Sequence, residues 1–229
     1  MNGLFKRPGE SGLERICLCF ARAIDTTMMH GLNDTATKTI NRTKTTQDAV
    51  NCFLNCCACN PNTIIMFWAS DMVLQINSDR DHLAAPKARS QGSGHHFLGD
   101  HEGILFNAPV CVLAKVLKHV TASVAETKLG AICANAQEAT LFRQTLQDMG
   151  HPQGPTPVKA DDTTADGIVS EKMKAKCLKG ADNRLHWMKD RAAQGQFNVC
   201  WESAETNLAD CTSTFREHRN CKRAGKTWQ

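Results

Sequence analysis

Three aspartates in distant parts of this chain, Asp79, Asp161 and Asp210, have the side chains best suited to metal chemistry. Carboxylates drawn from separate segments can hold two divalent cations, which clamp the attacking and leaving oxygens of a phosphodiester and help to generate a hydroxide nucleophile. A lone aspartate is more commonly a helix cap or a turn residue at the end of a strand. The residues alone leave both interpretations open.

The hydrophobic pattern around these aspartates predicts an α/β fold, with a mixed sheet covered by helices. Asp79 and Asp161 each follow a predicted strand, and ligands in such sheets bind at strand ends. Gly92 and Gly94 indicate a hairpin connection at residues 86–94. The predicted strands are 63–67, 72–77, 95–98, 110–114, a short strand ending at 161, and 197–201. The predicted helices are 13–23, 45–59, 125–149, 164–173, 178–193 and one beginning near residue 206.

The composition is that of a globular protein. Hydrophobic residues make up 41% of the 229 residues, which is enough for a core. No stretch approaches the roughly 18 uninterrupted apolar residues of a membrane span, and the N-terminal segment lacks the order of a signal peptide. We therefore expect an intracellular protein, in the cytoplasm or the nucleus. The net charge of +4 is compatible with a nucleic-acid partner but too small to establish one.

The chain has 12 cysteines and no tyrosine. Cys56 and Cys59 have a C-x-x-C spacing, and Cys17, Cys19 and Cys52 lie upstream, so a cysteine-rich zinc-binding module is one interpretation. No second C-x-x-C or H-x-x-x-H follows at a finger-like distance, and a disulfide scaffold needs a secretory context. The other interpretation is a set of free thiols in half-buried positions.

Other residues with functional potential each have a structural alternative. His95 and His96 lie on a predicted strand, where they can bind metal or, more commonly, lie at the surface or half-buried. Trp187 and Trp201 are expected in the core. A group of basic residues can contact nucleic-acid phosphates or form a solvated helix face: Lys172, Lys174, Lys176, Lys179, Arg184, Lys189 and Arg191.

Five blocks of sequence resemble, in order and spacing, the ribonuclease H domain of copia-type LTR retrotransposon Pol polyproteins. The resemblance covers residues 72–214, and residues 20–25 and 32–34 resemble the end of the reverse transcriptase region that precedes this domain. It implies a reverse transcriptase remnant at 1–70, a ribonuclease H-like domain at 71–214 and a tail at 215–229. The blocks are 78–79 with 86–90, 125–138, 161–165, 179–191 and 207–210.

The resemblance implies hydrolysis of the RNA strand of RNA:DNA hybrids by two magnesium ions held by Asp, Glu, Asp and Asp. It also implies a ribonuclease H-like mixed sheet of about five strands flanked by helices, with an N-terminal helical extension. Asp79, Asp161 and Asp210 match the first, third and fourth ligands, which gives them catalytic and metal-binding roles. The glutamate position is occupied by Lys128.

Lys128 puts a positive charge where the family has a metal ligand. At about 4 Å and an effective dielectric near 20, a unit charge and a divalent cation interact by roughly 8 kcal/mol before solvation, and Lys128 reverses the sign. Glu126 does not replace the ligand, because two helical positions differ by about 200° of rotation. Losing about 4 kcal/mol slows a reaction roughly a thousandfold. We expect impaired hydrolysis; the alternative is a non-catalytic nucleic-acid-binding or structural remnant of a retroelement.

Further departures from the family pattern accompany Lys128. Asp162 stands where the family has asparagine, and Cys211 stands where it has tyrosine. Cys19, Cys56 and Cys200 also fall at tyrosine positions, which explains the missing tyrosines by single-base changes. These departures favour a decayed copy of the element, and stoichiometric zinc on Cys56 and Cys59 would argue against it. The Asp-Asp motif of the reverse transcriptase is absent from the sequence, which excludes polymerase activity.

Overall fold

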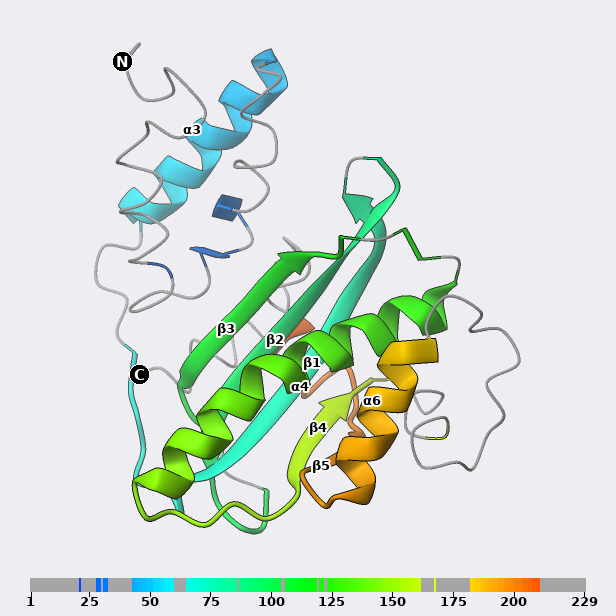
Figure 1. The fold of residues 1–229 in the computed structure, drawn as a ribbon. Helices are drawn as coiled ribbons and strands as arrows, with labels where there is room; N and C mark the ends of the chain where they lie inside the picture. Colours follow the sequence, from blue (N-terminus) through cyan, green and yellow to red (C-terminus); the bar gives the residue numbers. More distant parts are fainter. Residues whose placement is uncertain are drawn as a thin grey trace. The chain divides into compact units, whose positions relative to one another are not determined.

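The computed structural model describes residues 21, 28–29, 31–32, 43–59, 65–85, 87–103, 106–118, 120–121, 123–161, 167 and 182–210. The chain divides into two compact units, residues 1–65 and 66–228 (Figure 1), and each is described by itself. The predictions for residues 164–173 and 215–229 concern segments outside the described residues, apart from residue 167. The assignment of residues 1–70 to a reverse transcriptase remnant stays a prediction.

The first unit contains helix α3, Lys44–Cys59, which confirms the helix predicted at 45–59. Thr43 precedes the helix, and its hydroxyl accepts a hydrogen bond of 3.2 Å from the backbone N–H of Thr46, as a helix cap does. Val50 is buried, and the ring of Phe53 lies against Gly31. This helix therefore packs through an apolar face within its own unit.

The second unit is built on a five-stranded mixed sheet of order β3-β2-β1-β4-β5 (Figure 1). Strands β1, β2 and β3 pair antiparallel, while β4 pairs parallel with β1 and β5 pairs parallel with β4. The parallel pairs require crossovers, which run through helices α4 and α6. The strands are β1 (Val73–Ala85), β2 (Arg89–Gly99), β3 (Pro109–Val116), β4 (Thr156–Ala160) and β5 (Phe197–Trp201).

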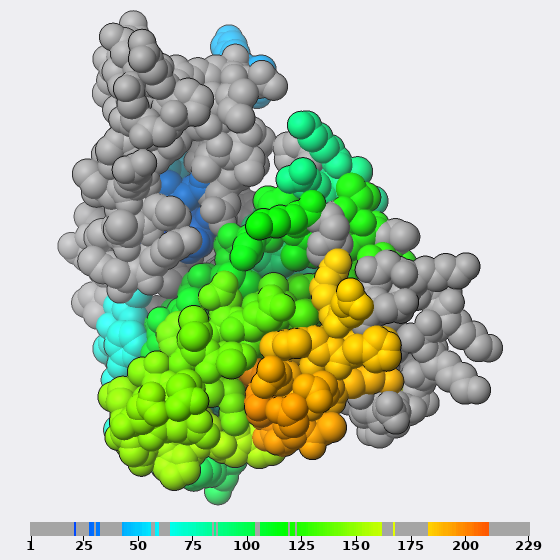
Figure 2. Space-filling view, in the orientation of Figure 1, coloured from blue at the N-terminus to red at the C-terminus, as the bar shows by residue number. Residues whose placement is uncertain are grey.

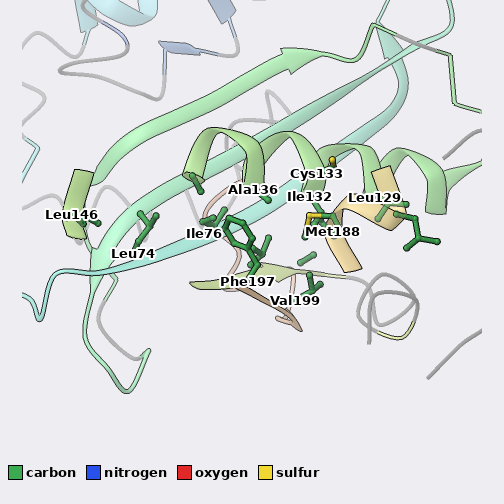
Figure 3. Close-up of a cluster of buried hydrophobic side chains, with 14 residues drawn as sticks. Leu74, Ile76, Leu129, Ile132, Cys133, Ala136, Leu146, Met188, Phe197 and Val199 are labelled. Atoms are coloured by element: carbon green, nitrogen blue, oxygen red, sulfur yellow. The ribbon is translucent and has the colours of Figure 1, made fainter. Parts of the chain in front are cut away.

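Helices α4 (Val124–Asp148) and α6 (Asp182–Ala193) pack side by side against one face of this sheet (Figure 2). Ser123 caps α4 by accepting a hydrogen bond from the Glu126 N–H, and Gly150 follows its end with φ of +88°. Burial of the apolar side chains between helices and sheet stabilises the fold (Figure 3). The core consists of Leu74, Ile76, Leu129, Ile132, Cys133, Ala136, Ala139, Leu146, Val158, Ala160, Leu185, Met188, Phe197 and Val199.

The fold is therefore an α/β mixed sheet of five strands flanked by helices, as the sequence predicts. Three antiparallel strands are followed by a helix, then by β4, α6 and β5 on the other side of β1. This order makes β1 the central strand. Because Ser78 pairs with Ala160, the last residue of β4, the residues that follow β4 lie beside the second half of β1.

The predicted hairpin connection at 86–94 is wrong, because Gly92 and Gly94 lie inside strand β2. A Cβ on Gly94 would lie 1.7 Å from Oδ1 of Asn135, and one on Gly92 would lie 3.2 Å from Cβ of Ala131. These glycines let α4 approach β2 closely. The turn itself contains Lys87 and Ala88, both with positive φ.

Three smaller predictions are corrected. Residues 65–70 are not a strand, and residues 204–209 are turns or irregular, so the helix predicted near Thr206 begins later, at residue 210. Trp201 is 56% exposed at the end of the edge strand β5 rather than in the core. Trp187 packs against the core, as expected.

Candidate functional site between the middle of strand β1 and the end of strand β4

Asp79 and Asp161 occupy corresponding positions on two neighbouring strands. In the parallel pairing of β1 with β4, Ser78 is the partner of Ala160; Asp79 is the next residue inside β1, and Asp161 is the first residue after β4. Adjacent strands lie about 4.8 Å apart. The fold therefore brings two carboxylates that are distant in sequence to the same level of the sheet.

Asp210 follows a turn that is fastened to the same part of the sheet. The Asn207 side-chain amide donates a hydrogen bond of 3.0 Å to the carbonyl of Ser78, the residue before Asp79. The Ser93 hydroxyl donates one of 3.1 Å to the carbonyl of Ala209, the residue before Asp210. Ser93 is also the antiparallel partner of Asp79. These contacts set the backbone of Asp210 beside the Asp79 strand.

Lys128 enters this region from helix α4. Its ammonium Nζ donates a hydrogen bond of 2.6 Å to Oδ1 of Asp161, and the two side chains are 7% and 30% exposed. Asp79, Lys128, Asp161 and Asp210 are hereafter the candidate site. A short ion pair between partly buried groups is stronger than one at the open surface.

Glu126 belongs to the regular first turn of α4. The helix is wound from Val124, and the N–H of Thr127 bonds the Ser123 carbonyl at 3.1 Å. The Glu126 side chain is 4% exposed. Because the helix start is not unwound, Glu126 and Lys128 keep the roughly 200° separation of ideal geometry.

The described residues do not fit the two-magnesium arrangement that the resemblance implies. Within the described ranges, no group of three or more histidine, cysteine, aspartate or glutamate side chains is arranged to hold a metal ion. The carboxylate that matches the third ligand is already bonded to an ammonium. Metal ligation by Asp79, Asp161 and Asp210 stays a prediction.

A hydroxyl cluster next to Lys128 was not expected from the sequence. His82 Nδ1 lies 2.7 Å from the Thr127 hydroxyl, which lies 2.6 Å from that of Thr121. The Ser90 hydroxyl lies 3.0 Å from the Thr121 hydroxyl. This cluster fixes the first turn of α4 to strands β1 and β2. Because its members come from four separate segments, no local pattern in the sequence indicates it.

His95 and His96 are both buried, which corrects the expectation of surface or half-buried positions. Burial lowers the pKa of His95 to about 4 and also lowers the pKa of His96. Nε2 of His95 donates to the Asn107 carbonyl at 3.3 Å, and Nε2 of His96 donates to Oδ1 of Asn135 at 3.0 Å. The two imidazoles are therefore neutral structural groups at neutral pH.

Asn135 is a second residue that sequence reasoning missed. It is fully buried on α4, and its amide donates hydrogen bonds to the Ser78 hydroxyl at 3.0 Å and to the Ser93 carbonyl at 2.9 Å. It therefore ties α4 to both strands immediately beside Asp79. Burying an asparagine inside a helix without hydrogen-bond partners would be costly. An asparagine among the apolar residues of a predicted helix is therefore the only sequence signal for Asn135.

The predicted phosphate-contacting residues divide into two groups. Lys172, Lys174, Lys176 and Lys179 lie outside the described residues. Arg184, Lys189 and Arg191 are half-buried on α6. Arg191 lies 5.5 Å from the centroid of the Trp187 ring and donates to the Gln196 side chain at 3.3 Å. Its contacts show a packing role, and the phosphate-binding role of this group stays a prediction.

Cys52, Cys59 and Cys133, in the described part of the chain, are free thiols. Cys52 and Cys59 are exposed on α3, and burial raises the pKa of Cys133 in the core to about 11. Cys17, Cys19 and the side chains of Cys56 and Cys57 lie outside what the structure describes. The zinc interpretation accordingly stays a prediction.

No protein-family model and no curated protein matches this chain. Among solved structures, it is similar to the N-terminal RNase H domain of rv2228c from Mycobacterium tuberculosis, with a TM-score of 0.45, 12% identity, and coverage of 68% of this chain and 98% of that one. LC11-RNase H1, isolated from compost by a metagenomic approach, has a TM-score of 0.46, 13% identity, and coverage of 61% and 91%. The same enzyme in complex with an RNA/DNA hybrid has a TM-score of 0.45, 14% identity, and coverage of 60% and 91%.

In the part of the chain that the structure describes, no helix has the length and apolarity of a membrane span.

Proposed function

We propose that this chain is a ribonuclease H-like domain from a copia-type retrotransposon polyprotein that binds RNA:DNA hybrids and hydrolyses them poorly or not at all. The ribonuclease H-like order of strands and helices supports the domain assignment. The five sequence blocks support the retrotransposon origin. The observation that carries the functional part is the 2.6 Å ion pair between Lys128 and Asp161.

The ion pair supports impaired hydrolysis for an electrostatic reason. Asp161 matches a metal ligand of the family, and here its carboxylate already compensates the charge of an ammonium. A divalent cation at this carboxylate would face the positive charge of Lys128 at close range. Losing about 4 kcal/mol of transition-state stabilisation corresponds to a roughly thousandfold slower reaction.

Hybrid binding and hydrolysis can be tested separately. Binding is measured by fluorescence anisotropy of a labelled RNA:DNA hybrid, with the matching double-stranded DNA as the competitor. Cleavage is measured on the same hybrid with magnesium, for the native chain and for Lys128→Glu. Lys115→Glu is the matched control, because it makes the same charge change at an exposed position on β3.

We expect hybrid binding by the native chain, little cleavage, and faster cleavage by Lys128→Glu than by Lys115→Glu. If the native chain fails to bind the hybrid in preference to DNA, the proposed function is wrong. If the native chain cleaves as fast as Lys128→Glu, the role given to Lys128 is wrong. If the native chain binds the hybrid but neither the native chain nor Lys128→Glu cleaves it, substitutions at other positions besides Lys128 have also removed the hydrolytic activity.

A further inference from the structure

We infer that the Lys128 ammonium is a fixed internal cation, which compensates the Asp161 carboxylate of the candidate site and makes the folded domain independent of divalent metal. The inference concerns the same site as the proposed function but does not depend on hybrid binding. It follows from the disagreement between the metal ligands that the resemblance implies and the side chains that are present.

The backbone brings the segments that carry the three aspartates of this site to one part of the sheet. Asp79 and Asp161 follow paired positions of the β1–β4 ladder. Asp210 follows a turn held by Asn207 and Ala209, through hydrogen bonds to Ser78 and Ser93. Gathering like charges is unfavourable unless an opposite charge lies close by. A positive charge at this point is therefore favourable.

Lys128 is held in a position to supply that charge. Its neighbour Leu129 is buried in the core at 2% exposure, and the preceding Thr127 belongs to the buried hydroxyl cluster. Ser123 caps the same turn of helix. The Lys128 side chain is only 7% exposed, so its stem is packed and its ammonium is directed at Asp161. Because Thr127 and Leu129 on either side of Lys128 are both buried, the lysine backbone is held in place and its side chain does not leave the site easily.

A fixed ammonium changes the response of the domain to metal. In a site of carboxylates alone, a divalent cation binds the folded state in preference to the unfolded chain and raises its stability. With Lys128 in place, a divalent cation must displace the ammonium or bind beside it. The native domain is therefore expected to fold equally well with and without magnesium, and replacing Lys128 by an acid is expected to create a dependence on magnesium.

The experiment is thermal unfolding of the full chain in EDTA and in about 10 mM magnesium chloride, with potassium chloride added to equalise the ionic strength. The variants are Lys128→Glu and the control Lys115→Glu. We expect the Tm of the native chain and of the control to change by less than about 1 °C, and the Tm of Lys128→Glu to rise by about 5 °C or more in magnesium. Calcium chloride is used in a parallel series.

Stabilisation of the native chain by magnesium, to the extent seen for Lys128→Glu, would overturn the inference. So would a Lys128→Glu variant that is folded in EDTA and unchanged by either metal. If Lys128→Glu is unfolded in EDTA and folds when magnesium is added, the result is the expected one in its strongest form. If it is unfolded under both conditions, the neutral variant Lys128→Met is measured, and a Tm that does not rise in magnesium would then count against the inference. No hybrid is present in these measurements, so failure here counts against the role given to Lys128 and not against hybrid binding.

Discussion

The ammonium of Lys128 lies 2.6 Å from Oδ1 of Asp161, which joins the first turns of α4 to the end of β4. The two residues are 33 positions apart in the sequence. This pairing compensates, with a protein side chain, the charge of a carboxylate that the sequence resemblance assigns to a metal site.

The energetic coupling of Lys128 with Asp161 is expected to be about 1–2 kcal/mol in the free energy of unfolding, between the values for exposed and buried pairs. A double-mutant cycle with Lys128→Met, Asp161→Asn and the double variant isolates it, with urea unfolding in EDTA as the measurement. A coupling near zero would show that the pair does not stabilise the domain.

Gly94→Ala is expected to destabilise the domain by about 2 kcal/mol or more. The added methyl group would lie 1.7 Å from Oδ1 of Asn135, which is itself bonded to His96 and Ser78. Gly154→Ala is the control, because a Cβ there meets no atom within 4 Å, and it is expected to be neutral or slightly stabilising. Equal stability of the two variants, measured by urea unfolding, would contradict the close packing of α4 on β2.

The free energy of unfolding is expected to fall as the pH drops from about 6.5 towards 4. Burial holds the pKa of His95 at about 4, below its ordinary value of 6.5, against an opposing hydrogen bond to Asn107. Between these values the unfolded chain binds more protons, so stability is present at neutral pH and is lost on acidification. The limiting slope for one such group is about 1.4 kcal/mol per pH unit.

This pH dependence is checked by urea unfolding at a series of pH values, for the native chain and for His95→Gln. The variant is expected to be less stable at neutral pH and to show a smaller slope. His96 contributes in the same direction, so some slope remains. A slope that His95→Gln leaves unchanged would show that His95 is not the group responsible.

Thr127→Val is expected to cost about 1–2 kcal/mol of stability, since it removes the hydroxyl that lies 2.7 Å from His82 and 2.6 Å from the Thr121 hydroxyl. Thr145→Val, at an exposed position on the same helix, is the control for the loss of helix propensity. Urea unfolding of both variants decides the point. If Thr127→Val lowers the free energy of unfolding no more than Thr145→Val does, the hydroxyl cluster does not stabilise the domain.

The elements with strong local patterns could be predicted from the sequence. Strand β5 has the predicted bounds, and α4 is displaced by only one residue at each end, because its apolar spacing and Gly150 lie within the segment itself. Strand β1 was predicted too short. It continues through Arg80, Asp81 and His82, polar residues that give no strand pattern and are held there by pairing with β2.

The site was predictable only in part, because some of its features depend on contacts between residues that are distant in the sequence. Asp161 directly follows β4, as its local pattern predicts, whereas Asp79 was expected at a strand end and lies inside β1. The direction of the Lys128 side chain could not be predicted, since a lysine has many rotamers and its choice depends on packing around α4. The burial of His95 and His96 depends on Asn107 and Asn135, which lie 12 and 39 residues away.

The most direct test of the central claim is the single-turnover rate at which the RNA strand of an RNA:DNA hybrid is cleaved. The rate is measured with magnesium and with the protein in saturating excess over the hybrid, for the native chain and for Lys128→Glu. The account predicts that Lys128→Glu is faster by at least about a hundredfold, within the roughly thousandfold that about 4 kcal/mol allows. Equal rates of cleavage by the two proteins would contradict it.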